Sequence, residues 1–327
     1  MLVALTNKTS IFLRKIRGKI NERKGEKVAN NPFSIFNVEL TNKCPMSCIM
    51  CPRTNNMTRN EGFMNFELFK KVVDEFTEKN PKACDGEFWL HHFGESLMHP
   101  GFPIFIEYAI KKGLKASISI NPIMLKKEIA TNLLKANPSM IYLSLDGHDD
   151  GSFERIRGLK NSYRKSKEYL LNFLEIKKSL GVKTKVLLSM IDFDQNKESI
   201  QQTKKYWEKI DGIDEFLIKE FVKWDGKAAD VNQLVNDSKR VRNKSKKVVC
   251  KFPWKSMTVT WDGNVVPCCY DYNNRYILGN VEKQTLSEIW NGEKMQLLRE
   301  EFIHNDVTNT LCSDCEMLYS NKSFSIL

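Results

Sequence analysis

The sequence predicts an α/β fold with a parallel sheet, followed by a small cysteine-bearing C-terminal part. Three observations lead to this prediction. Short β-rich runs alternate with amphipathic segments from Ser34 to about Glu220, this alternation stops after Glu220, and the cysteines are clustered rather than spread. Strands joined by helices need crossover connections, which pair the strands in parallel. The alternation alone leaves both an open barrel and a doubly wound sheet as solutions.

Runs rich in β-branched and aromatic residues predict six strands, at 35–40, 87–91, 115–120, 141–146, 184–190 and 215–219. Apolar residues at helical spacing between them predict five helices, at 66–79, 105–112, 126–136, 163–180 and 197–209.

After the sixth strand a polar segment of mixed charge predicts a linker or surface loop. The Asp262-Gly263-Asn264 turn between 256–261 and 265–267 predicts a β-hairpin, and one short helix is expected over 286–299. The chain is therefore expected to divide into a basic N-terminal extension (1–32), a βα domain (33–222), a linker (223–249) and a small cysteine-bearing domain (250–327).

The composition is that of an ordinary globular protein, with 41% hydrophobic and 28% charged residues in 327. No run of about eighteen apolar residues occurs, which predicts a protein without a membrane span, and no convincing signal peptide is recognisable. The net charge of +11 is concentrated in the first thirty residues. A solvated helix or an arm docked on the rest of the chain is the expected structure there, with attachment to an anionic membrane surface or an acidic partner as the alternative. No nucleic-acid-binding module is recognisable, so nucleic acid is not an expected partner.

The nine cysteines are odd in number and clustered, which favours metal binding over a disulfide framework. Cys44, Cys48 and Cys51 form a C-x3-C-x2-C array on the loop after the first strand, at the edge where parallel α/β folds place their sites. Three thiolates leave one coordination position open, as catalytic centres do. A zinc site completed by His91, His92 or His99 is the alternative that the spacing leaves open.

This array, followed by Gly62-Phe63-Met64 and a helix, resembles the radical S-adenosylmethionine (radical SAM) superfamily. The resemblance implies a partial (β/α)6 barrel in which the three cysteines hold a [4Fe–4S] cluster whose fourth iron binds SAM. Reduction of that cluster would cleave SAM to a 5′-deoxyadenosyl radical, which abstracts hydrogen from the substrate. The reductant would be a flavodoxin or a ferredoxin.

Further matches follow the later strands, and the resemblance implies that these residues bind SAM: Gly94 and Glu95, Ser119 and Asn121, Ser144 and Asp146, and Arg157. The sequence departs from the family pattern at Phe93, Ser96 and Pro122. It also has Met50 where an aromatic residue commonly precedes the third cysteine, beside the adenine.

Cys250, Cys268, Cys312 and Cys315 supply a second, closed set of four thiolates, which suits zinc and a [4Fe–4S] cluster equally. Their order, with Gly263 five positions before Cys268, resembles the C-terminal SPASM extension of radical SAM enzymes. The absence of cysteines after Cys315 resembles its shortened, one-cluster Twitch form, as in enzymes of the 2-deoxy-scyllo-inosamine dehydrogenase type. This implies a small hairpin-plus-helix domain and a second [4Fe–4S] cluster. Cys269 is an alternative to Cys268 as a ligand.

In such relatives the second cluster accepts an electron, so the resemblance implies dehydrogenation of a sugar, an aminocyclitol or a similar small polyol. His91 or His92 would accept the hydroxyl proton, since alternation along a strand directs only one of them inward. Both could instead be packing residues, and Asp192, Asp194 and Glu220 are further candidates for substrate contacts. Peptide modification is the second hypothesis, and a non-catalytic iron–sulfur redox sensor is the third.

Overall fold

The computed structural model describes residues 26–80, 83–235 and 250–319. Most of the basic N-terminal extension and the basic end of the expected linker lie outside the described residues, so what was expected of them stays a prediction. No helix in the described part of the chain is both long and apolar enough to cross a membrane.

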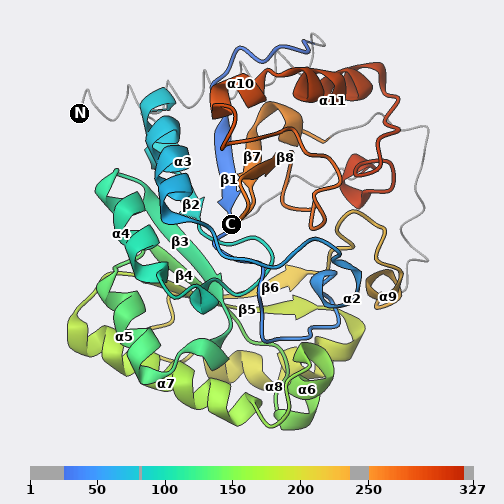
Figure 1. The fold of residues 1–327 in the computed structure, drawn as a ribbon. Coiled ribbons are helices and arrows are strands. Elements are labelled where there is room, and N and C mark those ends of the chain that lie inside the picture. Colours follow the sequence, from blue (N-terminus) through green and yellow to red (C-terminus); the bar gives the residue numbers. More distant parts are fainter. Residues whose placement is uncertain (1–25, 81–82, 236–249, 320–327) are drawn as a thin grey trace, which may run out of the picture.

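One nine-stranded sheet organises the described residues, in the order β6-β5-β4-β3-β2-β1-β7-β8-β9. Neighbouring strands pair in parallel from β6 through β1 to β7, whereas the pairs β7–β8 and β8–β9 are antiparallel. The sheet curls without closing, so the predicted partial (β/α)6 barrel is confirmed (Figure 1). Its parallel strands are β1 (Ser34–Val38), β2 (Glu87–Trp89), β3 (Lys115–Ile120), β4 (Met140–Ser144), β5 (Lys185–Asp192), β6 (Glu215–Glu220) and β7 (Ser256–Val259).

Helices cover the outer face of the barrel strands (Figure 1). The five expected ones are α3 (Phe66–Lys79), α4 (Phe102–Lys111), α5 (Lys127–Lys135), α7 (Tyr163–Leu180) and α8 (Lys197–Trp207). The short helices α2 (Arg53–Asn56), α6 (Asp150–Arg157) and α9 (Ala229–Asn232) were not expected. The described ranges also contain 3-10 turns at Ala83–Asp85, Ser96–Met98, Pro122–Met124, Asp194–Asn196, Phe252–Trp254 and Glu316–Tyr319.

Alternation along the strands separates two apolar clusters. Ile118, Ile141 and Leu188 belong to the large core under the helices. Residues at the opposite parity, Trp89, Tyr142 and Leu187 with Met140 and Leu217 against them, form a second cluster inside the barrel. Because successive side chains of a strand point to opposite faces, this second cluster identifies the inward positions of β2, β4, β5 and β6.

The cysteine-bearing C-terminal part continues the sheet of the barrel. β7 pairs in parallel with β1, and the expected hairpin follows as β7 and β8 (Asn264–Val266), with β9 (Gly279–Asn280) beside it. The single helix expected over 286–299 is wrong: two helices, α10 (Leu286–Trp290) and α11 (Glu293–His304), are separated at Asn291 and Gly292. Gly292 is the N-cap of α11 with extended backbone, so the helical hydrogen bonding restarts there.

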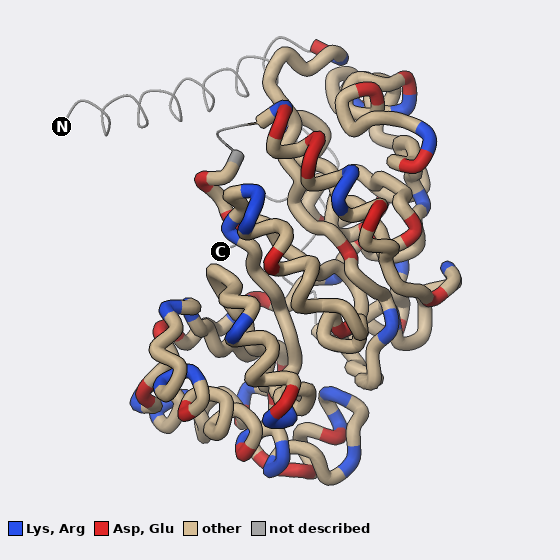
Figure 2. The backbone as a smooth tube through the Cα atoms, turned by 60° about the vertical axis from the view of Figure 1, so that its left-hand side comes forward, with Lys and Arg blue, Asp and Glu red and all other residues tan. Residues whose placement is uncertain are grey.

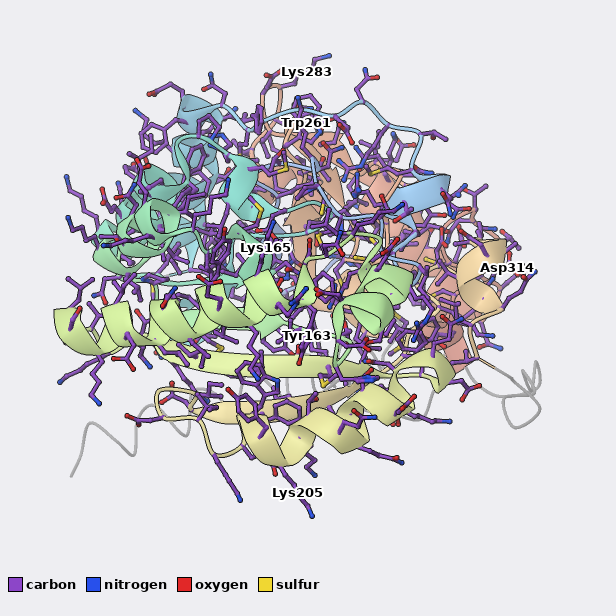
Figure 3. All side chains as sticks on the ribbon, turned by 90° about the horizontal axis from the view of Figure 1, so that it is seen from below. Tyr163, Lys165, Lys205, Trp261, Lys283 and Asp314 are labelled. Carbon is purple, nitrogen blue, oxygen red and sulfur yellow. The ribbon has the colours of Figure 1, made fainter. Side chains whose placement is uncertain are left out.

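Basic and acidic residues are interspersed along the described backbone (Figure 2). Figure 3 shows Lys283, from the C-terminal part, on the side of the molecule opposite Lys205 of α8.

Candidate functional site

The loop after β1 holds Cys44, Cys48 and Cys51 close together. It is attached to the end of α6, because Ser47 N donates to Arg157 O (3.1 Å) and Ile49 N to Ile156 O (3.1 Å). The pKa values of Cys44 and Cys51 are raised to about 12, mainly by burial, and for Cys51 also by the nearby Cys48. The thiols must lose these protons to bind metal, so iron binding would release protons here.

Gly94 and Glu95 lie directly against this loop. Gly94 has a φ of +106°, and a Cβ there would stand 2.4 Å from the carbonyl oxygen of Thr41, so the position requires glycine. Glu95 N donates to Lys43 O (2.8 Å), and its carboxylate accepts from Asn121 N (2.9 Å). Burial raises the pKa of Glu95 to about 7. A carboxyl held beside Cys44 in this way suits an amino group of a ligand on the open coordination position.

The residues after β3 and β4 reach the same edge of the sheet. Asn121 is buried and its Nδ2 donates to Ser144 O (3.2 Å). Asp146 is fully buried, and its carboxylate accepts from Ile191 N (2.7 Å), from Asn196 Nδ2 (2.6 Å) and from the Arg157 guanidinium. The hydrogen-bonding capacity of the Asp146 carboxylate is thus used by donors of the protein itself.

Arg157 joins this group to the cysteine loop. Its Nη1 lies 3.6 Å from Cys48 Sγ, and its Nε has no hydrogen-bond partner within the described residues. Gly158, which follows it, has a φ of +71°, and a Cβ there would lie 2.5 Å from Ser47 O. The close approach of α6 therefore places a guanidinium directly at the cluster loop.

Two further predicted residues line the neighbourhood. Met50 is buried and its carbonyl accepts from Trp224 Nε1 (3.0 Å), a contact that joins the cysteine loop to the segment after β6. Ser119 stands at an inward position of β3, opposite in parity to Ile118 of the outer core.

The two candidate histidines have different surroundings. His92 Nε2 lies 3.0 Å from Cys269 O and its Nδ1 3.4 Å from Glu39 Oε1, so both ring nitrogens face protein groups. His91 lies at the inward parity of Trp89, and its Nδ1 has no hydrogen-bond partner among the described residues. The pKa of His91 is lowered to about 3, mainly by burial and also by the charges of Lys219 and His92. His91 is thus a neutral imidazole facing the barrel interior.

His99, offered above as a zinc ligand, uses both ring nitrogens elsewhere. They face Met64 O and Gly101 N, each at 3.0 Å.

The second cysteine set surrounds an apolar pocket in the C-terminal part. Cys250, Cys268, Cys312 and Cys315 line it together with Phe252, Tyr270, Phe302, Leu311, Met317 and Leu318. Four thiols lining one apolar pocket fit a cluster with four cysteine ligands. Nowhere in the described ranges are three histidine, cysteine or carboxylate side chains placed to hold one metal ion. A [4Fe–4S] cluster spreads its thiolate ligands more widely, since each binds a different iron.

Cys269 does not line this pocket. Its carbonyl meets His92, and Lys219 acts electrostatically on its thiol. The geometry therefore supports Cys268 as the ligand.

Sequence reasoning missed three contributors. Lys219 of β6 lies 3.9 Å from the centroid of the Tyr142 ring. Because Leu217 and Lys219 are two residues apart on one strand, their side chains share a face, and this alternation could have indicated that Lys219 points inward. Glu39 and Arg59 form a buried ion pair that no local pattern indicated. Of the proposed carboxylates, Asp194 pairs with Lys197 (2.5 Å), and Glu220 stands at the parity opposite Lys219, next to Asp192 in the register.

Comparisons with known proteins agree with this geometry. The family model of the radical SAM superfamily matches residues 38–206, and the SPASM iron–sulfur cluster-binding domain matches residues 250–316. The tungsten-containing aldehyde ferredoxin oxidoreductase cofactor-modifying protein of Pyrococcus furiosus is 24% identical over 321 residues, covering 86% of each chain. The S-adenosyl-L-methionine-dependent 2-deoxy-scyllo-inosamine dehydrogenase of Niallia circulans is 20% identical, covering 86% of this chain and 92% of its own.

Two solved structures show the same fold. BtrN in complex with AdoMet and 2-DOIA has a TM-score of 0.56 at 18% identity, covering 87% of this chain and 93% of that one. Streptococcus suis SuiB bound to the precursor peptide SuiA has a TM-score of 0.63 at 16% identity, covering 92% of this chain and 73% of that one.

The radical SAM model covers more than half of the chain and includes the three-cysteine loop. This chain is therefore a member of the radical SAM superfamily, a SAM-dependent enzyme with a C-terminal SPASM domain and more than one [4Fe–4S] cluster.

Proposed function

We propose that this radical SAM enzyme dehydrogenates a hydroxyl-bearing carbon of a sugar, an aminocyclitol or a similar small polyol. The observation that carries the proposal is the closed set of four cysteines in the same chain as the open set of three. Four protein thiolates leave no iron free to bind substrate, which suits electron transfer. A relative matched over 92% of its length is named as a dehydrogenase of such a substrate, which supports the proposal.

The chain's own residues would divide the work as follows. Cys44, Cys48 and Cys51 hold the first cluster and leave one position for SAM. Glu95 would accept from the SAM amino group, and Arg157 would pair with its carboxylate. When bound, SAM and the two clusters supply a radical that takes the hydrogen atom from the carbon, and an acceptor for one electron.

The hydroxyl proton is the remaining product of oxidising an alcohol to a ketone. His91 is the better placed of the two histidines to accept it, because its Nδ1 is unengaged and faces the barrel interior. His92 would instead hold the C-terminal part against the barrel through its contact with Cys269 O.

Two measurements test the proposal: the iron content of the protein and the formation of a ketone product. Anaerobically reconstituted protein should contain about eight irons per chain, and a Cys44→Ala/Cys48→Ala/Cys51→Ala variant about four. With SAM and a reductant, a carbon-deuterated polyol substrate should transfer deuterium to 5′-deoxyadenosine and yield a ketone. A total of four irons that are all lost in the triple variant would contradict an electron-accepting second cluster.

Peptide modification is the second candidate, supported by the fold shared with SuiB over 92% of this chain. Formation of 5′-deoxyadenosine with a peptide but with no sugar would favour it over polyol oxidation. For both activities we expect flavodoxin or ferredoxin as the electron donor, and the cytoplasm as the compartment, since the clusters are oxygen-labile.

A further inference from the structure

Lys219 is a charged residue of the barrel to which the proposed reaction gives no role. It stands on β6 at the parity of Leu217, which packs against the cluster of Trp89, Tyr142 and Leu187 inside the barrel. Its ammonium lies 3.9 Å from the centroid of the Tyr142 ring, across β5. The side chain therefore extends over the inner face of the sheet.

Residues near both cysteine sites act electrostatically on Lys219. The groups whose charges act on it are Asp146 and Arg157 on the side of the first site, and Cys269 on the side of the second. Arg157 itself reaches Cys48, so it lies nearer to the first cluster than Lys219 does. A substrate located between SAM and the second cluster would pass close to this ammonium.

Within the described residues the ammonium has no partner of opposite charge, because Lys219 Nζ makes no ion pair or hydrogen bond there. Asp146, the carboxylate whose charge acts on Lys219, pairs instead with Arg157. Among the described residues, Lys219 is thus a positive charge that no ion pair balances.

The environment of this charge favours an anion. The Lys219 side chain is exposed to solvent, yet desolvation by the surrounding protein lowers its pKa to about 8. The charge of Asp146 opposes this shift, and that of Arg157 adds to it. An accessible but partly desolvated cation gains more from an opposite charge than one in bulk water, because the local dielectric constant is lower.

We propose that Lys219 binds an anionic group of the substrate, a carboxylate or a phosphate, so that the enzyme acts on an acidic or phosphorylated sugar. A cationic aminocyclitol would instead be repelled by this ammonium. The substrate class rests on the proposed polyol oxidation, whereas the anion site itself does not. Because Lys219 acts electrostatically on His91, an anion bound to Lys219 would position the sugar ring near the His91 imidazole.

Equilibrium binding to the reconstituted, SAM-loaded chain tests this inference with four probes of one ring type: glucose, glucosamine, glucuronate and glucose 6-phosphate. Glucuronate or glucose 6-phosphate should bind at least ~10-fold more tightly than glucose, and glucosamine most weakly. The tighter of the two anions distinguishes a carboxylate from a phosphate site. Lys219→Met should abolish the preference and Lys219→Arg should keep it. Lys185→Met, at the opposite end of the strands, is the matched control.

A second readout does not depend on the sugar. Labelling of Lys219 by an amine-reactive reagent, followed by mass spectrometry, should be slowed by inorganic phosphate or acetate, and labelling of Lys185 should not. Binding without an anion preference together with unprotected Lys219 would overturn the inference, as would a preference that survives in Lys219→Met. An intact preference without ketone formation would overturn the dehydrogenase proposal alone.

Discussion

Cys268 and Cys269 are adjacent in the sequence but have different surroundings. Cys268 lines the apolar pocket with Cys250, Cys312 and Cys315, while the Cys269 carbonyl contacts His92 and its thiol lies near Lys219. We therefore expect Cys268→Ser to lower the iron content from about eight to about four per chain, and Cys269→Ser to leave it unchanged. Iron and sulfide analysis of the two variants, reconstituted side by side, checks this. Loss of iron in Cys269→Ser but not in Cys268→Ser would show that Cys269, and not Cys268, is the cluster ligand.

Glu39 is a buried carboxylate that contacts residues of both the barrel and the C-terminal part. Its carboxylate pairs with Arg59 at 2.5 Å, lies 3.4 Å from His92, and accepts from Trp261 N at 3.2 Å. Burial alone would raise the pKa of Glu39, but the hydrogen bonds with His92 and Arg59 outweigh it and lower the pKa to about 2. The carboxylate is thus ionised in the folded protein at neutral pH.

Replacing Glu39 by glutamine leaves the buried Arg59 without a counter-charge. We expect Glu39→Gln to lower the free energy of unfolding by about 3 kcal/mol at pH 7, measured by urea denaturation. Because the folded pKa lies below the ordinary value of 4.5, the stabilisation is complete above that value and is lost as the pH falls toward 2, so the two proteins should converge in acid. Glu61→Gln, which removes the half-exposed Arg53–Glu61 pair, should cost less than about 1 kcal/mol. Equal losses in both variants would contradict the role of Glu39.

At the scale of elements, the sequence predicted the strands and helices whose formation depends on the spacing of their own apolar residues. All six barrel strands and five helices are present, because alternating or helical apolar spacing has a single way of burying its apolar face. The helix α6 escaped prediction because only eight residues form it, and its ends depend on the Asp149 capping box and on Gly158 in left-handed conformation. The break between α10 and α11 depends likewise on one glycine N-cap.

The residues of the candidate site likewise fall into those that a local motif indicates and those that only the tertiary structure brings there. The cysteine spacing and the Gly94-Glu95 segment are local in sequence, so they were recognisable. Lys219, Glu39 and Arg59 acquire their surroundings only through strand order and tertiary contacts, as the long separation between Lys219 and Tyr142 shows. The sequence also gave no sign that β7 pairs with β1, because parallel pairing between distant segments leaves no local pattern.

At the scale of the whole molecule, this β1–β7 pairing makes the C-terminal part an extension of the barrel sheet. Ser34 to Val38 pair with Ser256 to Val259 along the length of β1, and the indole Nε1 of Trp290 donates to Asn31 O (3.1 Å). Arg299, fully buried, donates to the carbonyl oxygens of Pro253, Trp290 and Lys27. Removing residues 250–327 would therefore expose the edge of β1 and the apolar face beneath α10.

We accordingly expect the full chain to unfold in one cooperative transition, and a chain ending at residue 249 to aggregate, because an exposed long strand edge pairs with other chains. Thermal unfolding of the reconstituted protein under anaerobic conditions, followed by tryptophan fluorescence and by cluster absorbance, checks the first expectation through coincident midpoints. Size-exclusion chromatography of the shortened chain checks the second. A monodisperse shortened chain that still binds four irons and cleaves SAM would show that the barrel folds independently, and the role of the shared sheet would then be limited to placing the second cysteine set beside the interior of the barrel.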